Sequence, residues 1–238
     1  MAQLLYGKNV VKQILSDSRK VNKVYLTSSD AEIIAMCRKQ NVTVQMCDRQ
    51  MLTKMCKTDR HQGVAAETDP YRTYSVNELL KGVKTKDRGL LIMLDQLEDP
   101  HNLGAVLRTA DAVGADGVIF KKDRAVGLTP TVAKVSAGAI DTVKCAEVTN
   151  LVTTLQDLQK QNWWAVGTDM DAQDYRSLAY DRNIVLIIGS EGKGISRLLR
   201  QKCDYVVSIP MVGKITSLNA SVSAGILMYE IYSSRFPL

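Results

Sequence analysis

Short apolar runs alternate with helical patterns over residues 89–238. Such continuous runs indicate strands covered on both faces, which predicts an α/β fold with a mostly parallel sheet between layers of helices. Ligands bind these sheets at the carboxyl ends of the strands, so the informative loops follow Gln96, Thr168, Gly189 and Pro210. The predicted strands cover residues 90–97, 116–120, 142–148, 163–169, 183–190 and 205–211.

The first 70 residues show a shorter alternation, which predicts a small α/β sandwich of pattern α-β-α-β-α-β. Val10, Val11, Ile14 and Leu15 share one face of the first helix, and Asp30 is the expected N-cap of the second. The other elements are strands at 21–29, 41–48 and 62–68 and helices at 31–40 and 51–55.

A polar connector separates these two parts. Asp69 and Pro70 end the preceding strand, and Ser75 with Glu78 forms a capping-box signature for one short helix. The chain is therefore expected to divide into a small domain at 1–70, a linker at 71–88 and a larger domain at 89–238.

The composition, with 45% hydrophobic and 24% charged residues, is that of an ordinary globular protein. Apolar runs too short to span a bilayer and an N-terminus without a signal-peptide pattern predict a cytoplasmic protein without membrane contact. Five single cysteines without a CxxC pair and only two histidines predict neither a disulfide framework nor a metal centre. The net charge of +6 suits a nucleic-acid partner, and the first 70 residues, with 11 basic against 7 acidic residues, are the more basic part.

The first segment with chemical character is residues 94–120, where acidic residues and a proline lead from a strand into a helix. Asn102 is the expected N-cap of that helix, and Gly104 keeps its first turn slim. Arg108 follows six residues after Asn102, so both side chains are expected to face one cleft. The alternative for Arg108 is a surface salt bridge with Asp111.

The second segment is residues 184–211, in which a glycine-rich turn follows a buried strand. Backbone N–H groups of such a turn can hold a polar ligand, although an ordinary tight turn explains the glycines equally well. Gly189, Gly192 and Gly194 give GxxGxG instead of the dinucleotide-binding GxGxxG, and Lys193 precedes Gly194 where a P-loop needs Lys before Ser or Thr. A nucleotide-binding oxidoreductase is therefore disfavoured.

The third segment, residues 214–232, predicts an amphipathic terminal helix. Asn219 lies at its start, where simple capping is the alternative to a functional role. Small residues along the helix allow close packing. Apolar residues recur at helical spacing, namely Leu218, Val222, Ile226 and Tyr229.

The order and spacing of these three segments resemble the signature motifs of the SpoU (TrmH-like) branch of the SPOUT methyltransferases. The resemblance covers roughly residues 89–238. The first 70 residues also resemble the small RNA-substrate-binding domain of many members, with His61-Gln-Gly-Val near its end. The matching motif residues are Asn102-Leu-Gly-Ala with Arg108-Thr-Ala, Gly189-Ser-Glu-Gly-Lys-Gly, and Ile209-Pro-Met with Ser217-Leu-Asn-Ala-Ser.

The resemblance implies a sheet whose C-terminal chain threads through a loop in a deep trefoil knot, and S-adenosylmethionine bound by the knotted loops. Main-chain groups would read the adenine edge of this cofactor while apolar side chains cover its faces. It also implies a homodimer with the terminal helix in the interface and an active site completed by the partner subunit. The residues implied to surround the cofactor are Thr168, Gly189, Ile209, Met211 and Leu218.

The implied reaction is methyl transfer to a ribose 2′-hydroxyl of RNA. Arg108 would activate the hydroxyl by contact with it and with the adjacent phosphate; whether it accepts the proton is open, because arginine ordinarily stays protonated. Asn102, Glu191, Ser217 and Asn219 match other polar positions of the family and would orient Arg108 and the ribose. Glu191 could instead cap its loop.

The two-domain layout resembles the large-subunit (23S) ribosomal RNA Gm methyltransferases, which implies a guanosine of that RNA as the substrate. A tRNA 2′-O-methyltransferase is the alternative within the family. A non-catalytic RNA-binding or ribosome-assembly protein on the same fold is the alternative from another class. The intact set of Asn102, Arg108, Glu191 and Asn219 argues against that last reading.

Overall fold

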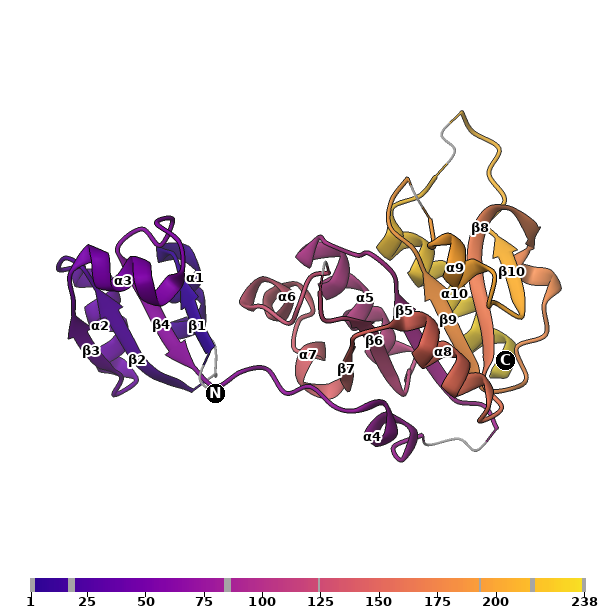
Figure 1. Ribbon diagram of the computed structural model, residues 1–238, viewed down its shortest axis with the longest axis horizontal. Coiled ribbons are helices and arrows are strands. Elements are labelled where there is room, and N and C mark those ends of the chain that lie inside the picture. Colours follow the sequence, from indigo (N-terminus) through magenta and orange to yellow (C-terminus); the bar gives the residue numbers. More distant parts are fainter. Residues whose placement is uncertain are drawn as a thin grey trace. The chain divides into compact units, whose positions relative to one another are not determined.

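The chain forms two compact units, Met1–Tyr71 and Arg72–Leu238. The computed structural model describes residues 3–16, 20–83, 87–123, 125–192, 194–214 and 217–236. Three parts of the segments singled out in the sequence lie outside these residues, namely 84–86 in the polar run at 84–89, Lys193 in the glycine-rich turn, and 215–216 in the third segment. Each unit has its own sheet and its own core (Figure 1).

The first unit is a four-stranded sheet of order β1-β4-β2-β3. The predicted alternation is confirmed from its first helix onward, and Asp30 accepts a hydrogen bond from the Ile33 backbone as the N-cap of α2. The prediction that the unit begins with a helix was wrong, because residues 3–6 pair antiparallel with β4, a partner distant in sequence. The elements are β1 (Gln3–Tyr6), α1 (Lys8–Ser16), β2 (Val21–Leu26), α2 (Ala31–Lys39), β3 (Thr43–Met46), α3 (Arg49–Cys56) and β4 (Val64–Thr68).

Helices cover both faces of this first sheet. Val11 of α1 and Ile33 of α2 pack on one face together with Val24, and Leu52 of α3 packs on the other face against Tyr25. Alternate residues of a strand point to opposite faces, so the sheet separates an α1–α2 side from an α3 side.

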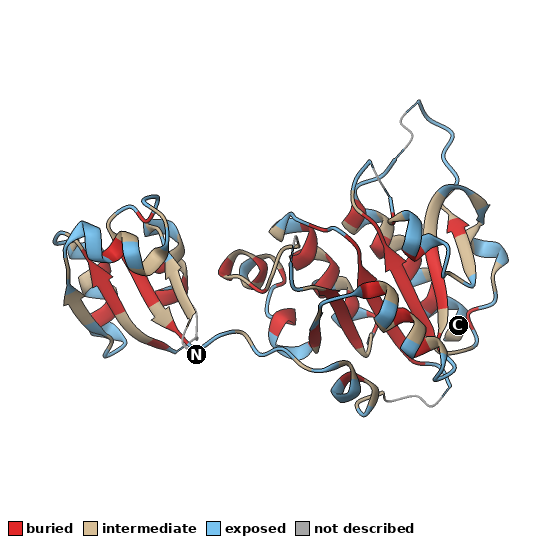
Figure 2. Ribbon diagram, viewed as in Figure 1, coloured by how far each residue is buried: buried red, intermediate tan, exposed pale blue. Residues whose placement is uncertain are grey.

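The second unit contains a six-stranded sheet of order β10-β8-β9-β5-β6-β7, and every neighbouring pair is parallel. The predicted mostly parallel α/β sheet is confirmed. Strands β5 and β9 lie in its middle and are buried along their whole length (Figure 2). The strands are β5 (Leu90–Leu94), β6 (Gly117–Lys121), β7 (Cys145–Val148), β8 (Trp164–Asp174), β9 (Ile184–Ile188) and β10 (Tyr205–Ser208).

Two layers of helices enclose this sheet. Leu79, Leu155 and Leu199 bring α4, α8 and α9 onto one face, whereas α5 and α10 pack against each other on the opposite face. None of the helices among the described residues is long and apolar enough to cross a membrane. The helices are α4 (Val76–Leu80), α5 (Pro100–Ala112), α6 (Pro130–Val135), α7 (Ala139–Thr142), α8 (Leu151–Gln159), α9 (Arg197–Arg200) and α10 (Ala220–Arg235), with a 3₁₀ turn at Tyr175–Ser177.

Helix α4 arises from the connector between the units. The predicted capping box is present, since Ser75 accepts from the Glu78 backbone while the Glu78 carboxylate accepts from the Ser75 backbone. Leu79 is fully buried in the core of the second unit. The connector helix is therefore part of the packed structure of that unit.

Helix α5 begins earlier than the sequence predicts. Its N-cap is Asp99, whose side chain accepts from the His101 backbone at 3.0 Å, and Pro100 occupies the first helical position. Proline suits that position because its missing N–H needs no partner there. The prediction of Asn102 as N-cap was wrong, and its amide is free for contacts outside the helix.

Helix α10 has two apolar faces. Its buried face uses Ala224, Leu227 and Ile231. The predicted stripe lies on the other side, where Val222 is 49% and Tyr229 50% exposed. The prediction of an amphipathic helix was wrong in this respect, because the face opposite the core is also apolar.

The end of α10 is held by Arg235. Its guanidinium donates to the backbone carbonyls of Tyr180, Arg88 and Arg182 at 2.9, 2.7 and 2.7 Å. Burial lowers the pKa of this side chain to about 10. The contacts connect the terminal helix to the segments that enter β5 and β9.

Replacing Arg235 by Ala is expected to lower the free energy of unfolding of the second unit by about 2–3 kcal/mol, because four backbone carbonyls, with Gly89 as the fourth, lose a charged donor. Both tryptophans, Trp163 and Trp164, belong to this unit, so urea unfolding followed by tryptophan fluorescence reports on it alone. The control is Arg176→Ala, which removes an exposed ion pair and is expected to change little. Equal effects of the two variants on the free energy of unfolding would contradict a stabilising role of the Arg235 hydrogen bonds.

Candidate active site

A pocket of about 230 Å³ opens at the carboxyl ends of β9 and β10. Its place agrees with the general rule for ligand sites in parallel sheets. Two of the predicted polar residues, Glu191 and Ser217, contribute to its wall. All of the predicted cofactor residues line it, namely Thr168, Gly189, Ile209, Met211 and Leu218.

The glycine-rich turn forms one wall of this pocket. Ser190 and Gly194 exchange backbone hydrogen bonds of 3.2 and 3.0 Å, which closes a narrow hairpin. A Cβ atom on Gly189 would lie 2.0 Å from the Gly194 carbonyl carbon, so no other residue fits there without moving the backbone. The turn is therefore tight, and its residues line the pocket.

A second wall comes from an irregularity in β8. Val206 of β10 lies opposite Gly167, but the next residue, Val207, lies opposite Gln173. Residues 168–172 therefore leave the ladder, and Thr168 and the two residues after it line the pocket. A bulge of this kind re-aims side chains beside a site.

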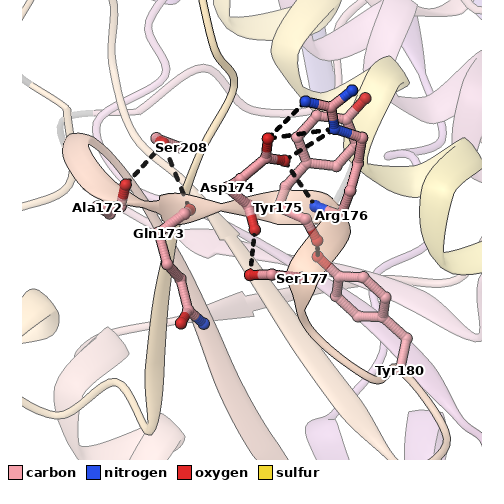
Figure 3. A network of polar contacts seen from close by, with 8 residues as sticks. All are labelled: Ala172, Gln173, Asp174, Tyr175, Arg176, Ser177, Tyr180 and Ser208. Carbon is pink, nitrogen blue, oxygen red and sulfur yellow. Dashed lines mark hydrogen bonds and ion pairs between the residues drawn. The ribbon is translucent and has the colours of Figure 1, made fainter.

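Polar contacts hold the end of this bulge, where β8 pairs with β10 again (Figure 3). The Ser208 hydroxyl donates to the carbonyls of Ala172 and Gln173 at 2.8 and 3.3 Å. Beyond them, the Arg176 guanidinium donates to the Asp174 carboxylate and lowers the pKa of that carboxyl to about 2. The Ser208 contacts therefore hold the bulge at its far end, whereas the Arg176–Asp174 pair is a local, exposed ion pair.

The carboxylate of Glu191 collects three donors beside the pocket. Its Oε1 accepts from the side-chain amide of Asn102 at 3.0 Å, from that of Asn219, and from the backbone N–H of Ala220 at 3.4 Å. The Asn219 amide also donates to Oδ1 of Asn102 at 2.9 Å. Three predicted residues from three distant segments thus form one network.

The direction of these hydrogen bonds follows from the helix start. Oδ1 of Asn219 accepts from the backbone N–H groups of Ser221 and Val222 at 2.9 and 3.3 Å, as an N-cap does. Its Nδ2 must therefore donate toward Asn102 and Glu191. Capping and network formation are consequently two uses of the same Asn219 side chain.

Arg108 lies apart from this network. It follows Asn102 by six residues, which turns it about 240° around the helix, and it is exposed whereas Asn102 is only 8% exposed. Among the described residues, no hydrogen bond or ion pair connects Arg108 to the network or to Asp111, whose carboxylate accepts from Thr142 at 2.6 Å. Within one chain, Asn102 and Arg108 do not share a cleft.

The thiols offer no reactive centre in this unit. Burial raises the pKa of Cys145 and of Cys203 to about 12, which keeps both protonated at neutral pH. Over the described ranges, no group of three or more His, Cys, Asp or Glu side chains is placed to hold a metal ion.

Asp95 is a residue that the sequence reasoning missed. It ends β5, is 3% exposed, and its Oδ2 accepts from the backbone N–H of Ser196 at 2.7 Å. Ser196 lies two residues after Gly194, the last glycine of the turn. The sequence did offer a signal for this role, because Asp95 is a carboxylate directly after a buried strand. The predicted strand at 90–97 had included Asp95, so the signal was overlooked.

Replacing Asp95 by Ala is expected to speed hydrogen exchange at residues 189–196, because the turn loses its anchor to β5. The matched control is Asp116→Ala, since Asp116 accepts from the Leu90 backbone at 2.8 Å at the opposite end of the same strand. Each variant is expected to lose about 1–3 kcal/mol of stability. Mass spectrometry that finds unchanged exchange in the turn of the Asp95 variant would disprove the anchor.

Known proteins share both units of this chain. Residues 89–229 match the SpoU rRNA Methylase family, and residues 4–74 match the RNA 2′-O ribose methyltransferase substrate binding family. YacO of Bacillus subtilis (strain 168), assigned to the TrmH family of tRNA/rRNA methyltransferases, is 45% identical over 98% of this chain and 96% of its own length. A relative in Staphylococcus aureus (strain COL) with the same assignment is 43% identical over the same shares.

A solved structure supports the same fold. The SpoU methyltransferase AviRb from Streptomyces viridochromogenes, in complex with the cofactor AdoMet, superposes with a TM-score of 0.67 at 23% identity. The match covers 99% of this chain and 91% of AviRb. With the family matches and the identity to YacO, these likenesses show that the chain belongs to the SpoU rRNA methylase family.

Proposed function

We propose that this protein transfers a methyl group from S-adenosylmethionine to a ribose 2′-hydroxyl of RNA. The observation that carries the proposal is the junction at Glu191, which lines the pocket and also accepts from Asn102 and Asn219. The pocket would hold the donor and the adjoining network would meet the ribose. The SpoU family membership and the AdoMet complex of AviRb support the same assignment.

The residues of the pocket fit the cofactor. Ile209, Met211 and Leu218 provide apolar side chains for the faces of an adenine ring, and the glycine-rich turn provides backbone groups for its edge. Glu191 places a carboxylate in the wall, which suits a ligand that carries positive charge. S-adenosylmethionine, when bound, supplies a methyl group on a sulfonium that is already a good leaving group.

The protein must then position a weakly acidic hydroxyl and make it more reactive. We assign this task to Arg108, whose guanidinium would donate to the hydroxyl and to the adjacent phosphate and so lower the effective pKa of the hydroxyl. Arginine stays protonated at neutral pH, so the proton of the hydroxyl would pass to solvent water as the oxygen–methyl bond forms, and the donor would leave as the neutral thioether S-adenosylhomocysteine. Asn102, Ser217 and Asn219 would orient the ribose.

A second copy of the chain is the partner that would complete this site. Arg108 is exposed and outside the pocket of its own chain. Helix α10 carries an exposed apolar face whose aromatic rings contact one another, with Tyr229 and Tyr232 at 6.2 Å and Tyr232 and Phe236 at 5.1 Å between centroids. Such a face favours burial against another protein. A homodimer through α10 would cover it and bring Arg108 beside the partner's pocket.

The substrate proposed first is a guanosine of 23S ribosomal RNA, because the chain carries a substrate-binding unit before the catalytic one. The name of YacO, a TrmH family tRNA/rRNA methyltransferase, leaves tRNA as the second candidate. The trefoil knot and the cytoplasmic location stay predictions.

Calorimetry is expected to show that the purified dimer binds S-adenosylmethionine, and Arg108→Ala is expected to bind it equally well. The same variant is expected to lose about a hundredfold or more in methyl-transfer rate, since it lacks the group that stabilises the developing oxyanion. Arg197→Ala, which removes an exposed arginine on the opposite face of the sheet, serves as the control. A folded dimer that binds no S-adenosylmethionine would refute the proposed function.

Deleting the gene is expected to remove one 2′-O-methylguanosine from 23S ribosomal RNA. Mapping of 2′-O-methyl sites in rRNA and tRNA from the deletion strain, with and without a plasmid copy of the gene, identifies the substrate. Loss of a methyl group from tRNA alone would replace the rRNA assignment by the tRNA one.

A further inference from the structure

One side of the first unit carries a cluster of exposed basic residues. Residues 49–60, which include α3 and the turn after it, carry four basic residues against one acidic residue. Arg49, Lys54, Lys57 and Arg60 are all exposed. In the described part of the chain, none of the four has an ion-pair partner within 4.0 Å. Their charges are therefore available to a ligand.

The lysines of α1 are in a different situation. Lys8 pairs with Asp30 at 3.1 Å and Lys12 pairs with Glu32 at 2.5 Å, so acidic groups of the α2 segment balance both charges. Arg38 and Lys39 are in the last turn of α2, where cations stabilise the end of a helix. Two of the four basic residues on the helices of the α1–α2 side are thus ion-paired, whereas among the described residues none of the four on the α3 side is.

A buried histidine connects α3 to the turn that follows it. His61 is fully buried, and its Nδ1 accepts from the Gly63 backbone at 3.0 Å. The proton of the neutral ring is therefore on Nε2, which donates to the Thr53 hydroxyl in α3 at 3.0 Å. The imidazole connects the turn to the helix, so the basic side chains project from a fixed backbone.

Exposed apolar side chains accompany this charge. Tyr6 is 39% exposed and lies two residues after Leu4, which packs in the α3-side core, so both face that side of the sheet. Met51 is 42% exposed on α3 itself. Unpaired RNA bases stack on such side chains while cations contact the phosphates.

We propose that RNA docks on this surface, which we call the α3 surface and define by Tyr6, Arg49, Met51, Lys54, Lys57 and Arg60. The proposal rests on RNA being the substrate, and it selects one side of the first unit as the side that holds it. Lys54, Lys57 and Arg60 contact phosphates, and Tyr6 provides a stacking surface. The α1–α2 side does not contact the RNA.

The test compares two double variants of the full chain that remove equal positive charge. The first is Lys57→Gln with Arg60→Gln on the α3 surface, and the second is Lys8→Gln with Lys12→Gln on α1. Fluorescence anisotropy with a labelled Bacillus subtilis 23S rRNA transcript gives the dissociation constant at several salt concentrations. The α3-surface variant is expected to bind on the order of tenfold more weakly, with a salt slope lower by about 1.4–1.8. The α1 variant is expected to bind as the unmodified chain does.

Equal weakening by both variants, or by neither, would overturn the docking surface. The proposed function is read separately from the same proteins, because the α3-surface variant should raise KM for RNA while kcat and S-adenosylmethionine binding stay unchanged. If the unmodified chain binds RNA through this surface but methylates neither rRNA nor tRNA, the proposed enzymatic function is refuted. The proposed docking surface would still be supported. Circular dichroism of both variants controls for folding of the first unit.

Discussion

The carboxylate of Glu191 joins three parts of the second unit that are far apart in the chain. One of its oxygens accepts from Asn102 in α5, from Asn219 at the start of α10, and from the backbone that follows. An ionised carboxylate can serve several donors at once, whereas its loss would leave the Asn102 amide without its acceptor and the Asn219 amide with Asn102 alone. The relative positions of the glycine-rich turn, α5 and α10 therefore depend on this one group.

Backbone geometry prepares the place where that carboxylate acts. Gly189 permits the hairpin to close because no Cβ separates it from Gly194. Asp95 anchors the end of the same turn to β5, and the register shift between β8 and β10 moves residues 168–172 out of the sheet. The pocket is thus formed by departures from regular strand geometry at the carboxyl edge of an otherwise regular parallel sheet.

The two units divide the interactions that RNA methylation requires. The second unit holds Arg235 and Asp174 in structural contacts and leaves an apolar face of α10 exposed. The first unit instead presents unpaired basic residues on a turn that His61 keeps rigid. In the proposed function the two units meet different needs, namely attraction of phosphates by the first and placement of a hydroxyl by the second.

The sequence by itself determined the parallel sheet, the strand positions, the capping box at Ser75 and the family, because continuous apolar runs and ordered motifs are local patterns. It did not determine β1, the helix start at Asp99 or the role of Asp95, since each depends on a partner distant in the chain or on competition between neighbouring caps. Which face of α10 is buried was likewise decided by packing, because both faces are apolar. Only the tertiary structure brought Asn102, Glu191 and Asn219 onto shared hydrogen bonds, since side chains 89 and 117 residues from Asn102 meet it through the order of the strands.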